Sequence, residues 1–251
     1  MTKQVNSRFR SVRQFNHTIE KLLQDKFLNP GLRIALLQMH KETKASLSFL
    51  AHIDGVPRQV GRLRAIESLQ IGGGEHYLSG FVNLDVFPPA DVIWDCRYGL
   101  PFTNDQYRFI FSEHFLEHLD FPISVKRFLK EARRVLKPGG TLFIGVPDGG
   151  KAIRSYCDDK GRRFLNQLYS RCYRNRRPRA EIYGKLDLLN YLFRDQVENP
   201  RYTVHYWAYD FSSLKSLLLS VGFRSVKIAK FNGRYCNLER KFYTLYIKAV
   251  K

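Results

Sequence analysis

The chain has 251 residues, of which 44% are hydrophobic, and a formal net charge of +19 at pH 7. This is enough for one large folded domain with a buried core, and no apolar run approaches the roughly 20 residues that span a bilayer. The cysteines, Cys96, Cys157, Cys172 and Cys236, are far apart and indicate no disulfide framework. Because the N-terminus also lacks a signal-peptide segment, we expect a cytoplasmic protein, with peripheral contact at the inner face of a membrane left open.

The positive charge is unevenly distributed along the chain. Residues 1–66 carry 12 Lys and Arg against 4 Asp and Glu, and residues 151–251 carry 22 against 8. Residues 67–150 are mildly acidic, with 8 against 11. Basic flanks of this size favour an anionic partner such as nucleic acid, anionic lipid or a phosphorylated substrate. The alternative is a solvated basic face that only aids solubility.

Two helical segments open the chain, at 8–26 and 31–52, separated by Asn29-Pro30-Gly31. We expect this basic, amphipathic N-terminal extension, residues 1–65, to dock on its own domain rather than on a membrane. A linker into the main domain follows, marked by Gly55, Pro57 and Gly61.

From Ser68 onward, short apolar runs alternate with helical patterns, which indicates a parallel sheet with helical crossovers. The expected strands are 68–71, 81–86, 91–95, 107–112 and 141–146. A helix is predicted at 123–136, because apolar residues recur there at helical spacing and Lys137-Pro138-Gly139-Gly140 then stops it.

Residues 149–206 interrupt this alternation with a basic, tyrosine-rich insertion that contains an arginine cluster at 171–179. A helix from Phe211 to Val221 and two strands near 224–231 and 242–249 follow. We therefore expect an α/β fold with a Rossmann-like sheet over residues 66–251.

A glycine turn ends the first strand, in Leu69-Gln70-Ile71-Gly72-Gly73-Gly74. Glycines allow close approach of the backbone to a ligand, and Asp85 at the end of the second strand could accept hydrogen bonds from a ribose diol. Asp85 lies only 13 positions after Gly72, against ~20 in a dinucleotide fold. The spacing argues against a hydride-carrying cofactor.

Several further motifs follow the glycine turn in a fixed order. They are Trp94-Asp95, Leu100-Pro101-Phe102, the run from Phe111 to Leu119 (FSEHFLEHL), the run from Phe128 to Gly140 (FLKEARRVLKPGG) and Ile144-Gly145-Val146-Pro147-Asp148. This ordered set resembles the type 11 branch of class I S-adenosylmethionine-dependent methyltransferases. The resemblance covers residues 66–150 well and 205–251 more loosely.

The resemblance implies a seven-stranded sheet whose last strand is antiparallel, with S-adenosylmethionine across the carboxyl ends of the first strands. By position, the glycines would border the amino-acid part of the cofactor, Asp85 would hold the ribose, and Asp95 with Cys96 would lie beside the adenine. The cofactor-binding residues implied are Gly72, Gly73, Gly74, Asp85, Asp95, Cys96 and Ser112.

Two connections are shorter than the resemblance implies. Only residues 75–80 and 87–90 separate the first three strands, whereas a parallel crossover normally needs a dozen or more residues. The first two crossover helices should therefore be missing. We hypothesise that the N-terminal helices cover the sheet face left bare.

Methyl transfer to an alcohol needs alignment and a group that removes a proton. The candidates are Glu113 and His114 after the fourth strand, and His205 before the late helix. Each has a structural alternative: a helix-start carboxylate, a cofactor contact and an aromatic plug in the core. Glu117 and His118 are expected to hold their loop rather than to catalyse.

Asp148, Arg174 and Arg176 are the predicted substrate contacts, although Asp148 would also suit a plain turn. No metal is expected, because metal-ligand pairs of the H-x-x-x-H or C-x-x-C kind are missing. The absence of N-P-P-Y, D-P-P-Y and Pro-Cys motifs argues against methylation of adenine amines and of cytosine C5.

The sequence thus predicts methylation of an anionic small molecule, or of a glycan or lipid-linked acceptor, at oxygen or a sugar nitrogen. One alternative is an RNA methyltransferase that clamps phosphates with the arginine cluster. Another is a non-catalytic protein that keeps the fold to bind a partner or an anionic membrane.

Overall fold

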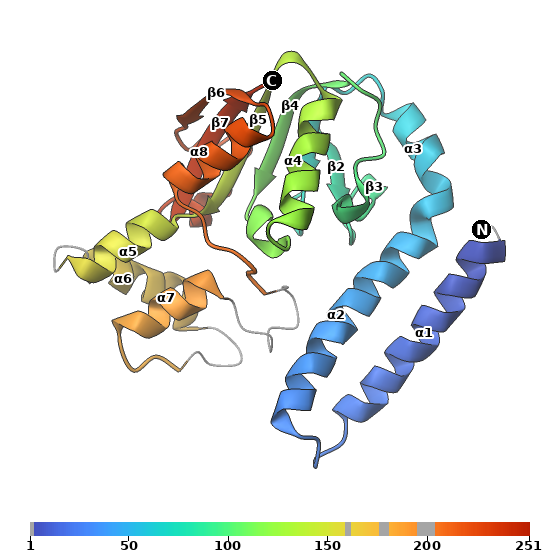
Figure 1. Cartoon of the computed structure of the whole chain (residues 1–251), viewed down its shortest axis with the longest axis horizontal. Coiled ribbons are helices and arrows are strands. Elements are labelled where there is room, and N and C mark those ends of the chain that lie inside the picture. Colours follow the sequence, from blue (N-terminus) through green and yellow to red (C-terminus); the bar gives the residue numbers. More distant parts are fainter. Residues whose placement is uncertain (1–2, 159–161, 176–180, 195–203) are drawn as a thin grey trace.

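The computed structural model describes residues 3–158, 162–175, 181–194 and 204–251. Within them, seven strands form one sheet in the order β3-β2-β1-β4-β5-β7-β6 (Figure 1). The strands are β1 (Ser68–Ile71), β2 (Val82–Asp85), β3 (Val92–Ile93), β4 (Tyr107–Glu113), β5 (Leu136–Pro147), β6 (Arg224–Ile228) and β7 (Thr244–Val250). Only β7 runs against its neighbours in this described sheet. The expected mostly parallel, Rossmann-like sheet with an antiparallel last strand is confirmed.

The helices predicted from hydrophobic spacing are also present. They are α1 (Lys3–Leu23), α2 (Pro30–His52), α4 (Ile123–Val135) and α8 (Phe211–Ser220). In α4 the recurring apolar residues are buried, including Val125, Phe128 and Leu129. The helix ends at Val135, two residues before the Lys137-Pro138 pair, because proline can neither donate to nor continue a helix.

One face of the sheet is covered by helices. Leu69 pairs with Ile110, and Ile110 pairs with Leu142, so these side chains point to the same side. They share a hydrophobic core with residues of α4, α8 and a short helix, α3 (Val56–Arg62). Figure 1 shows α3, α4 and α8 arranged along this side.

The opposite face is covered by aromatic side chains from two loops. No helix forms in residues 72–81 or 86–91, as the short connections predicted. Phe111 and Phe143, which point to this face, pack instead against Leu78 of the first loop and Tyr235 of the β6–β7 connection. Side chains of these two loops thus cover the face from which the crossover helices are missing.

Two expectations about the N-terminal segment are therefore wrong. Residues 53–62 are helical rather than a linker, with Pro57 in the first turn of α3, where its missing N–H costs nothing. Val56 and Val60 of α3 pack on the face that α4 and α8 cover, not on the face left bare. The physical reason is that the bare face already has its aromatic layer.

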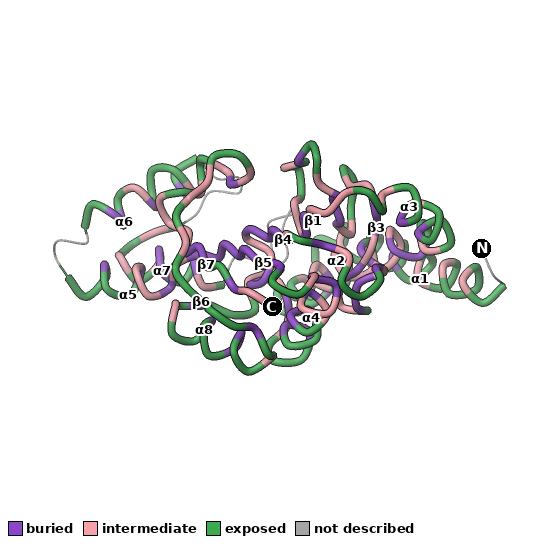
Figure 2. Tube along the Cα trace, turned by 90° about the horizontal axis from the view of Figure 1, so that it is seen from above, coloured by how far each residue is buried: buried purple, intermediate pink, exposed green. Residues whose placement is uncertain are grey.

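Helices α1 and α2 form an antiparallel hairpin that projects from the domain (Figure 1). Asn16 and Ile19 are the buried residues of α1, and Figure 2 shows this helix exposed over most of its length. Only the C-terminal part of α2 reaches the sheet edge, where Phe49 packs against Trp94 and Tyr98. No helix of the described residues is both long and apolar enough to cross a membrane.

The insertion at 149–206 contains a small helical unit with a core of its own. Its helices are α5 (Gly149–Cys157), α6 (Arg162–Leu168) and α7 (Lys185–Phe193), with a π-helical turn at Tyr169–Tyr173. Leu165, Leu168 and Leu192 lie at the centre of its core, and Phe242 and Tyr243 pack against them from the chain before β7. The unit therefore lies at the carboxyl end of β5, beside the edge where chemistry is expected.

Candidate functional site

The carboxyl ends of β1, β2, β4 and β5 meet at one edge of the sheet, because these strands are parallel. Open α/β sheets bind their ligands at this edge. Most of the residues singled out from the sequence lie here, on the turns that follow the four strands.

The three glycines have different structural roles. Gly72 has φ +70°, and a Cβ there would lie 2.2 Å from Cδ2 of Phe115. A Cβ on Gly73 would lie 2.5 Å from the Gln70 amide, which donates to His76 O. Gly74, with φ +56°, has nothing within 4 Å of that position. Gly72 and Gly73 are thus required by internal packing, and Gly74 is the glycine with open space for a ligand.

Asp85 ends β2 and is tied to the glycine turn. Its Oδ2 accepts from the Gly74 N–H at 2.9 Å, and its Oδ1 accepts from the Phe87 N–H at 3.1 Å. Burial raises the pKa of this carboxyl, although the two N–H groups oppose the shift. A carboxylate oxygen has a second lone pair, so Asp85 can still accept from a hydroxyl.

Asp95 is held by Arg97, and Arg97 reaches the N-terminal hairpin. The Arg97 guanidinium contacts Asp95 Oδ2 at 2.8 Å and Glu42 Oε2, on α2, at 2.7 Å. Both Asp95 oxygens accept from this guanidinium. Cys96 is buried, and its burial raises the pKa of the thiol well above the ordinary value. The pair predicted beside the adenine is therefore occupied by internal contacts.

Glu113 points away from the edge and into the aromatic face of the sheet. Its Oε1 accepts from the Tyr246 hydroxyl at 2.7 Å, and its Oε2 accepts from the Asn237 N–H at 3.1 Å. Arg240 lies 3.8 Å from Oε2. These contacts anchor the β6–β7 connection, so Glu113 has a structural role that differs from the helix-start carboxylate expected as its alternative.

His114 faces the edge and has an unusual backbone. Its φ is +53°, a left-handed conformation that is uncommon outside glycine and often marks a functional site. Its Nε2 lies 2.7 Å from Thr244 Oγ1, and the Thr244 hydroxyl donates to Arg240 O. We infer that Nε2 carries the proton and Nδ1 the lone pair. Burial, with nearby Arg240, keeps the pKa of His114 well below its usual range.

Glu117 lies next to His114, with its Oε1 3.5 Å from His114 Nδ1. It is only 1% exposed, and burial raises its pKa to about 8. Among the described residues, neither of its carboxyl oxygens makes a hydrogen bond of acceptable geometry, and the same holds for Ser112 Oγ and Tyr209 Oη. Buried polar atoms are normally paired, so this group indicates a site for a polar ligand or an ion.

A segment at 204–209 closes the site from the insertion side. The Tyr206 N–H donates to Glu117 O, and the Tyr206 hydroxyl accepts from Gln38 of α2. The segment brings His205 next to His118, with ring centroids 4.8 Å apart. It also presents Trp207, which stacks on Phe121 at 4.3 Å; their exposed fractions are 43% and 36%.

The predicted substrate residues have separate positions. Asp148 caps α5, accepting from the Lys151 N–H at 2.8 Å, whereas the structural alternative expected for it was a plain turn. Arg174 is exposed at the end of the π-helical turn. Arg176 lies outside the described residues. In the described residues, no hydrogen bond or ion pair joins Asp148 or Arg174 to His114 or Glu117, so the substrate roles of all three stay predictions.

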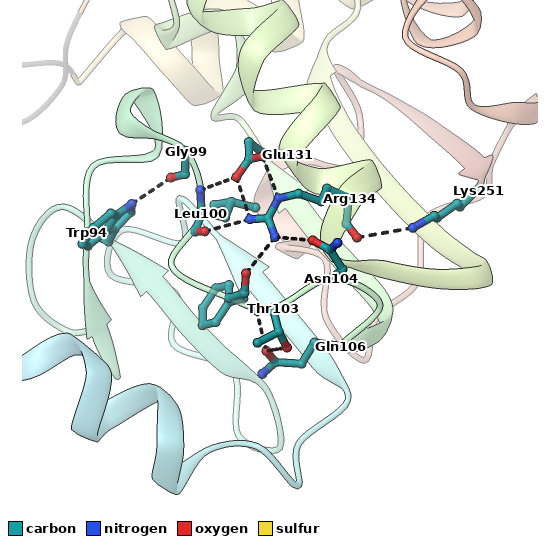
Figure 3. Close-up of polar contacts among 10 residues, drawn as sticks. Trp94, Gly99, Leu100, Thr103, Asn104, Gln106, Glu131, Arg134 and Lys251 are labelled. Atoms are coloured by element: carbon teal, nitrogen blue, oxygen red, sulfur yellow. Dashed lines mark hydrogen bonds and ion pairs between the residues drawn. The ribbon is translucent and has the colours of Figure 1, made fainter.

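The L-P-F and E-A-R-R motifs form a clamp, drawn in Figure 3. Glu131 of α4 accepts from the Leu100 N–H at 2.9 Å and pairs with Arg134 at 2.7 Å. Arg134 donates to the carbonyls of Leu100 and Phe102 at 3.0 and 2.9 Å. These motif residues therefore fix the segment before β4 to α4, and their role is structural.

The region that contains these motifs matches the model of a known protein family. The family model described as "Methyltransferase domain", of type 11, matches residues 90–144. Residues 90–144 are therefore similar to the methyltransferase domain of this family. The match runs from β3 through the L-E-H turn and α4 into β5, and the family implies S-adenosylmethionine as the cofactor of the domain.

Solved structures of similar fold include methyltransferases from three organisms. An S-adenosylmethionine-dependent methyltransferase from Thermotoga maritima is 14% identical, with 80% of this chain and 97% of that chain covered and a TM-score of 0.42. One from Archaeoglobus fulgidus is 15% identical, with 79% and 92% covered and a TM-score of 0.42. One from Methanosarcina mazei is 16% identical, with 73% and 91% covered and a TM-score of 0.44. A comparison with curated proteins gives no match.

The residues of the methyltransferase domain fit its cofactor in part. Gly74 offers an open approach, and Asp85 keeps lone pairs for ribose hydroxyls beside it. Two surface hollows, of about 470 and 390 Å³, lie elsewhere, one between Tyr98 and α4 and the other between α6 and α7. The residues that fit the cofactor, Gly74 and Asp85, thus lie at the open edge of the sheet and not at either of these hollows.

Sequence reasoning missed two groups at this site. Thr244 fixes the His114 tautomer, and Tyr209 places an unpaired hydroxyl in the buried polar group. Tyr209 carried a local signal, since it lies in the aromatic run that holds His205. Thr244 carried none, because only strand pairing brings β7 beside β5.

Proposed function

We propose that the methyltransferase domain transfers a methyl group from S-adenosylmethionine to an oxygen of an anionic acceptor, either a small molecule or a glycan or lipid-linked molecule. The observation that carries this proposal is the position and the neutral state of the His114 imidazole. The imidazole lies at the carboxyl end of β4, with its lone pair on Nδ1. A neutral imidazole can accept the proton that a hydroxyl loses during methyl transfer.

The surface around His114 supports an acceptor that contains a ring. Trp207, on the segment that closes the site, forms an exposed stacked pair with Phe121, which lies just before α4. Aromatic faces offer a large apolar surface with a negative electrostatic face, which suits the C–H groups of a sugar ring. The basic residues of α6 and its neighbourhood, such as Arg162, Arg163 and Arg174, favour a negatively charged acceptor.

The RNA alternative depended on an arginine cluster whose larger part, Arg176, Arg177 and Arg179, lies outside the described residues. No contact in the described part of the chain favours it over the sugar-like acceptor. Methylation of RNA is therefore treated as one outcome of the labelling experiment described below.

The cofactor part of the proposal is tested by calorimetry with S-adenosylmethionine. Asp85→Ala should weaken binding, because it removes the acceptor of the ribose hydroxyls. The matched control is Asp25→Ala, which removes an exposed carboxylate in the α1–α2 turn. No binding by the wild type, or equal binding by Asp85→Ala, contradicts the proposal.

The acceptor is identified by incubating the protein with labelled cofactor and fractionated cell extract. We expect label in the glycan, lipid-linked or small-molecule fraction, and a much lower rate in His114→Asn. Asparagine tolerates the left-handed backbone of residue 114, so this variant should keep its fold and its affinity for the cofactor. Label in RNA supports the alternative, and no label in any fraction supports a non-catalytic protein.

A further inference from the structure

We propose that Glu117, His118 and His205 form a binding site for one divalent transition-metal ion, such as Zn²⁺. Each residue offers one ligand atom, and the three atoms lie within 4.8 Å of one another. Two imidazoles and one carboxylate are a ligand set that divalent first-row metals accept. The proposal does not depend on the identity of the methyl acceptor.

The backbone brings the three ligands together from two parts of the chain. Glu117 and His118 are neighbours on the short 3-10 helix Leu116–His118. His205 lies on the closing segment, which is fixed to that turn by the hydrogen bond from the Tyr206 N–H to Glu117 O at 2.8 Å. A main-chain hydrogen bond thus holds together the two segments that carry the ligands.

Both imidazoles have the second contact that metal-binding histidines commonly make. His118 Nδ1 lies 3.3 Å from Val204 O, and His205 Nδ1 lies 2.8 Å from Leu192 O. A carbonyl can only accept, so each Nδ1 carries its proton and each Nε2 carries a lone pair. Such a carbonyl contact fixes the ring and raises the basicity of the ligating nitrogen.

Glu117 supplies a second observation, which is independent of the distances between the three ligand atoms. Its side chain is 1% exposed, and its two oxygens lack hydrogen-bond partners in the described part of the chain. A buried, unpaired carboxylate is costly unless a proton or a cation neutralises it. A bound cation would satisfy this carboxylate, with the two imidazoles as its further ligands.

Three protein ligands would not complete the coordination shell of the ion. Three protein ligands leave at least one coordination position for water or another oxygen in a zinc site. His114 and Tyr209 border the same region: His114 Nδ1 is 3.5 Å from Glu117, and the charge of Glu117 acts on the Tyr209 hydroxyl. The ion would therefore lie beside the proposed base and not at the glycine turn.

No metal was predicted from the sequence because closely spaced ligand pairs, such as H-x-x-x-H or C-x-x-C, are missing from it. His118 and His205 are far apart in the chain, and α4, β5 and the helical insertion lie between them. A ligand set completed by a distant segment has no spacing signal.

The test uses the full chain without an affinity tag, freed of metal by a chelator and titrated with ZnSO4 by calorimetry. We expect one equivalent to bind. His118→Ala and His205→Ala should each raise the dissociation constant at least about tenfold, because even the loss of a residue that only orients a metal ligand costs roughly 10- to 100-fold in affinity. His17→Ala, which removes an imidazole that is 64% exposed on α1, should leave it unchanged. Circular dichroism checks that the variants are folded.

A second readout uses the wild type alone, so it does not depend on the folding of a variant. Co²⁺ titration should give visible d–d absorption without a thiolate charge-transfer band. Absence of stoichiometric binding, unchanged affinity in both folded histidine variants, or a thiolate band that assigns the ion to a cysteine would overturn the proposal. Because no methyl donor is present, failure here is distinct from failure of the proposed function.

Discussion

Nδ1 of His114 lies 3.5 Å from Oε1 of Glu117, and the two side chains are only 9% and 1% exposed. Burial acts on them in opposite directions: it lowers the pKa of the imidazole and raises that of the carboxyl. Each shift favours the neutral form, as desolvation requires. In metal-free protein at neutral pH, we therefore expect a protonated Glu117 beside a neutral His114.

The first prediction concerns stability against pH in metal-free protein. The pKa of Glu117 is about 8 when folded and near its ordinary 4.5 when unfolded. The contribution of Glu117 to the free energy of unfolding is thus complete below about pH 4.5. It declines as the pH rises through 8, because the unfolded state releases the proton first. Glu117→Gln mimics the protonated acid, so it should gain stability relative to the wild type over this range, by up to roughly 5 kcal/mol.

Chemical denaturation at several pH values, with a chelator present, measures this difference. Taking the difference between the two proteins cancels the opposite contribution of His114. Glu20→Gln, on the mostly exposed helix α1, is the control and should show no such trend. A constant difference between pH 4.5 and 8 contradicts the assignment of Glu117 as a buried acid.

The second prediction separates two glycines of the same turn. Gly72 and Gly74 both have positive φ, but only Gly72 has Phe115 in the place of a Cβ. Gly74→Ala should cost about 1 kcal/mol for the backbone alone, and Gly72→Ala roughly 3 kcal/mol because overpacking adds to it. Urea denaturation measures both. Equal costs would mean that the Phe115 contact has no energetic weight.

The third prediction concerns the N-terminal segment. Helix α1 packs on α2, whereas Val56 and Val60 of α3 are part of the main core. Deleting residues 1–28 should change the melting temperature of the domain little. Deleting residues 1–65 should lower it strongly, since each buried valine stabilises by about 1.5 kcal/mol or more and Phe49 is also lost. A 1–65 deletion as stable as the full chain would contradict the packing of α3 described above.

The fourth prediction concerns the clamp between the L-P-F segment and α4. Arg134 donates to two carbonyls and pairs with Glu131. Arg134→Ala should cost about 2 kcal/mol, and Arg134→Lys should recover little, because a single ammonium cannot replace the planar fork. Thermal unfolding measures the loss, with Arg127→Ala on the same helix as the control. Full recovery by lysine would show that charge alone is sufficient.

Local signals predicted the elements of this protein well. Hydrophobic spacing and the Lys137-Pro138 stop placed α4 almost to the residue, and the short apolar runs marked every strand of the described sheet. The Gly55–Gly61 segment was predicted wrongly, because its proline and glycines indicate a break unless tertiary contacts hold the helix. Val56 and Val60 provide those contacts.

The sequence by itself determined the strands, the main helices and the ordered motifs of a methyltransferase domain, because these depend on residues close together in the chain. Only the tertiary structure decided what the site residues do. It turned Glu113 toward Tyr246, paired Asp95 with Arg97 and brought His205 to Glu117. The reason is physical: burial, hydrogen bonding and pKa depend on which distant segments meet, and residue spacing alone does not encode those meetings.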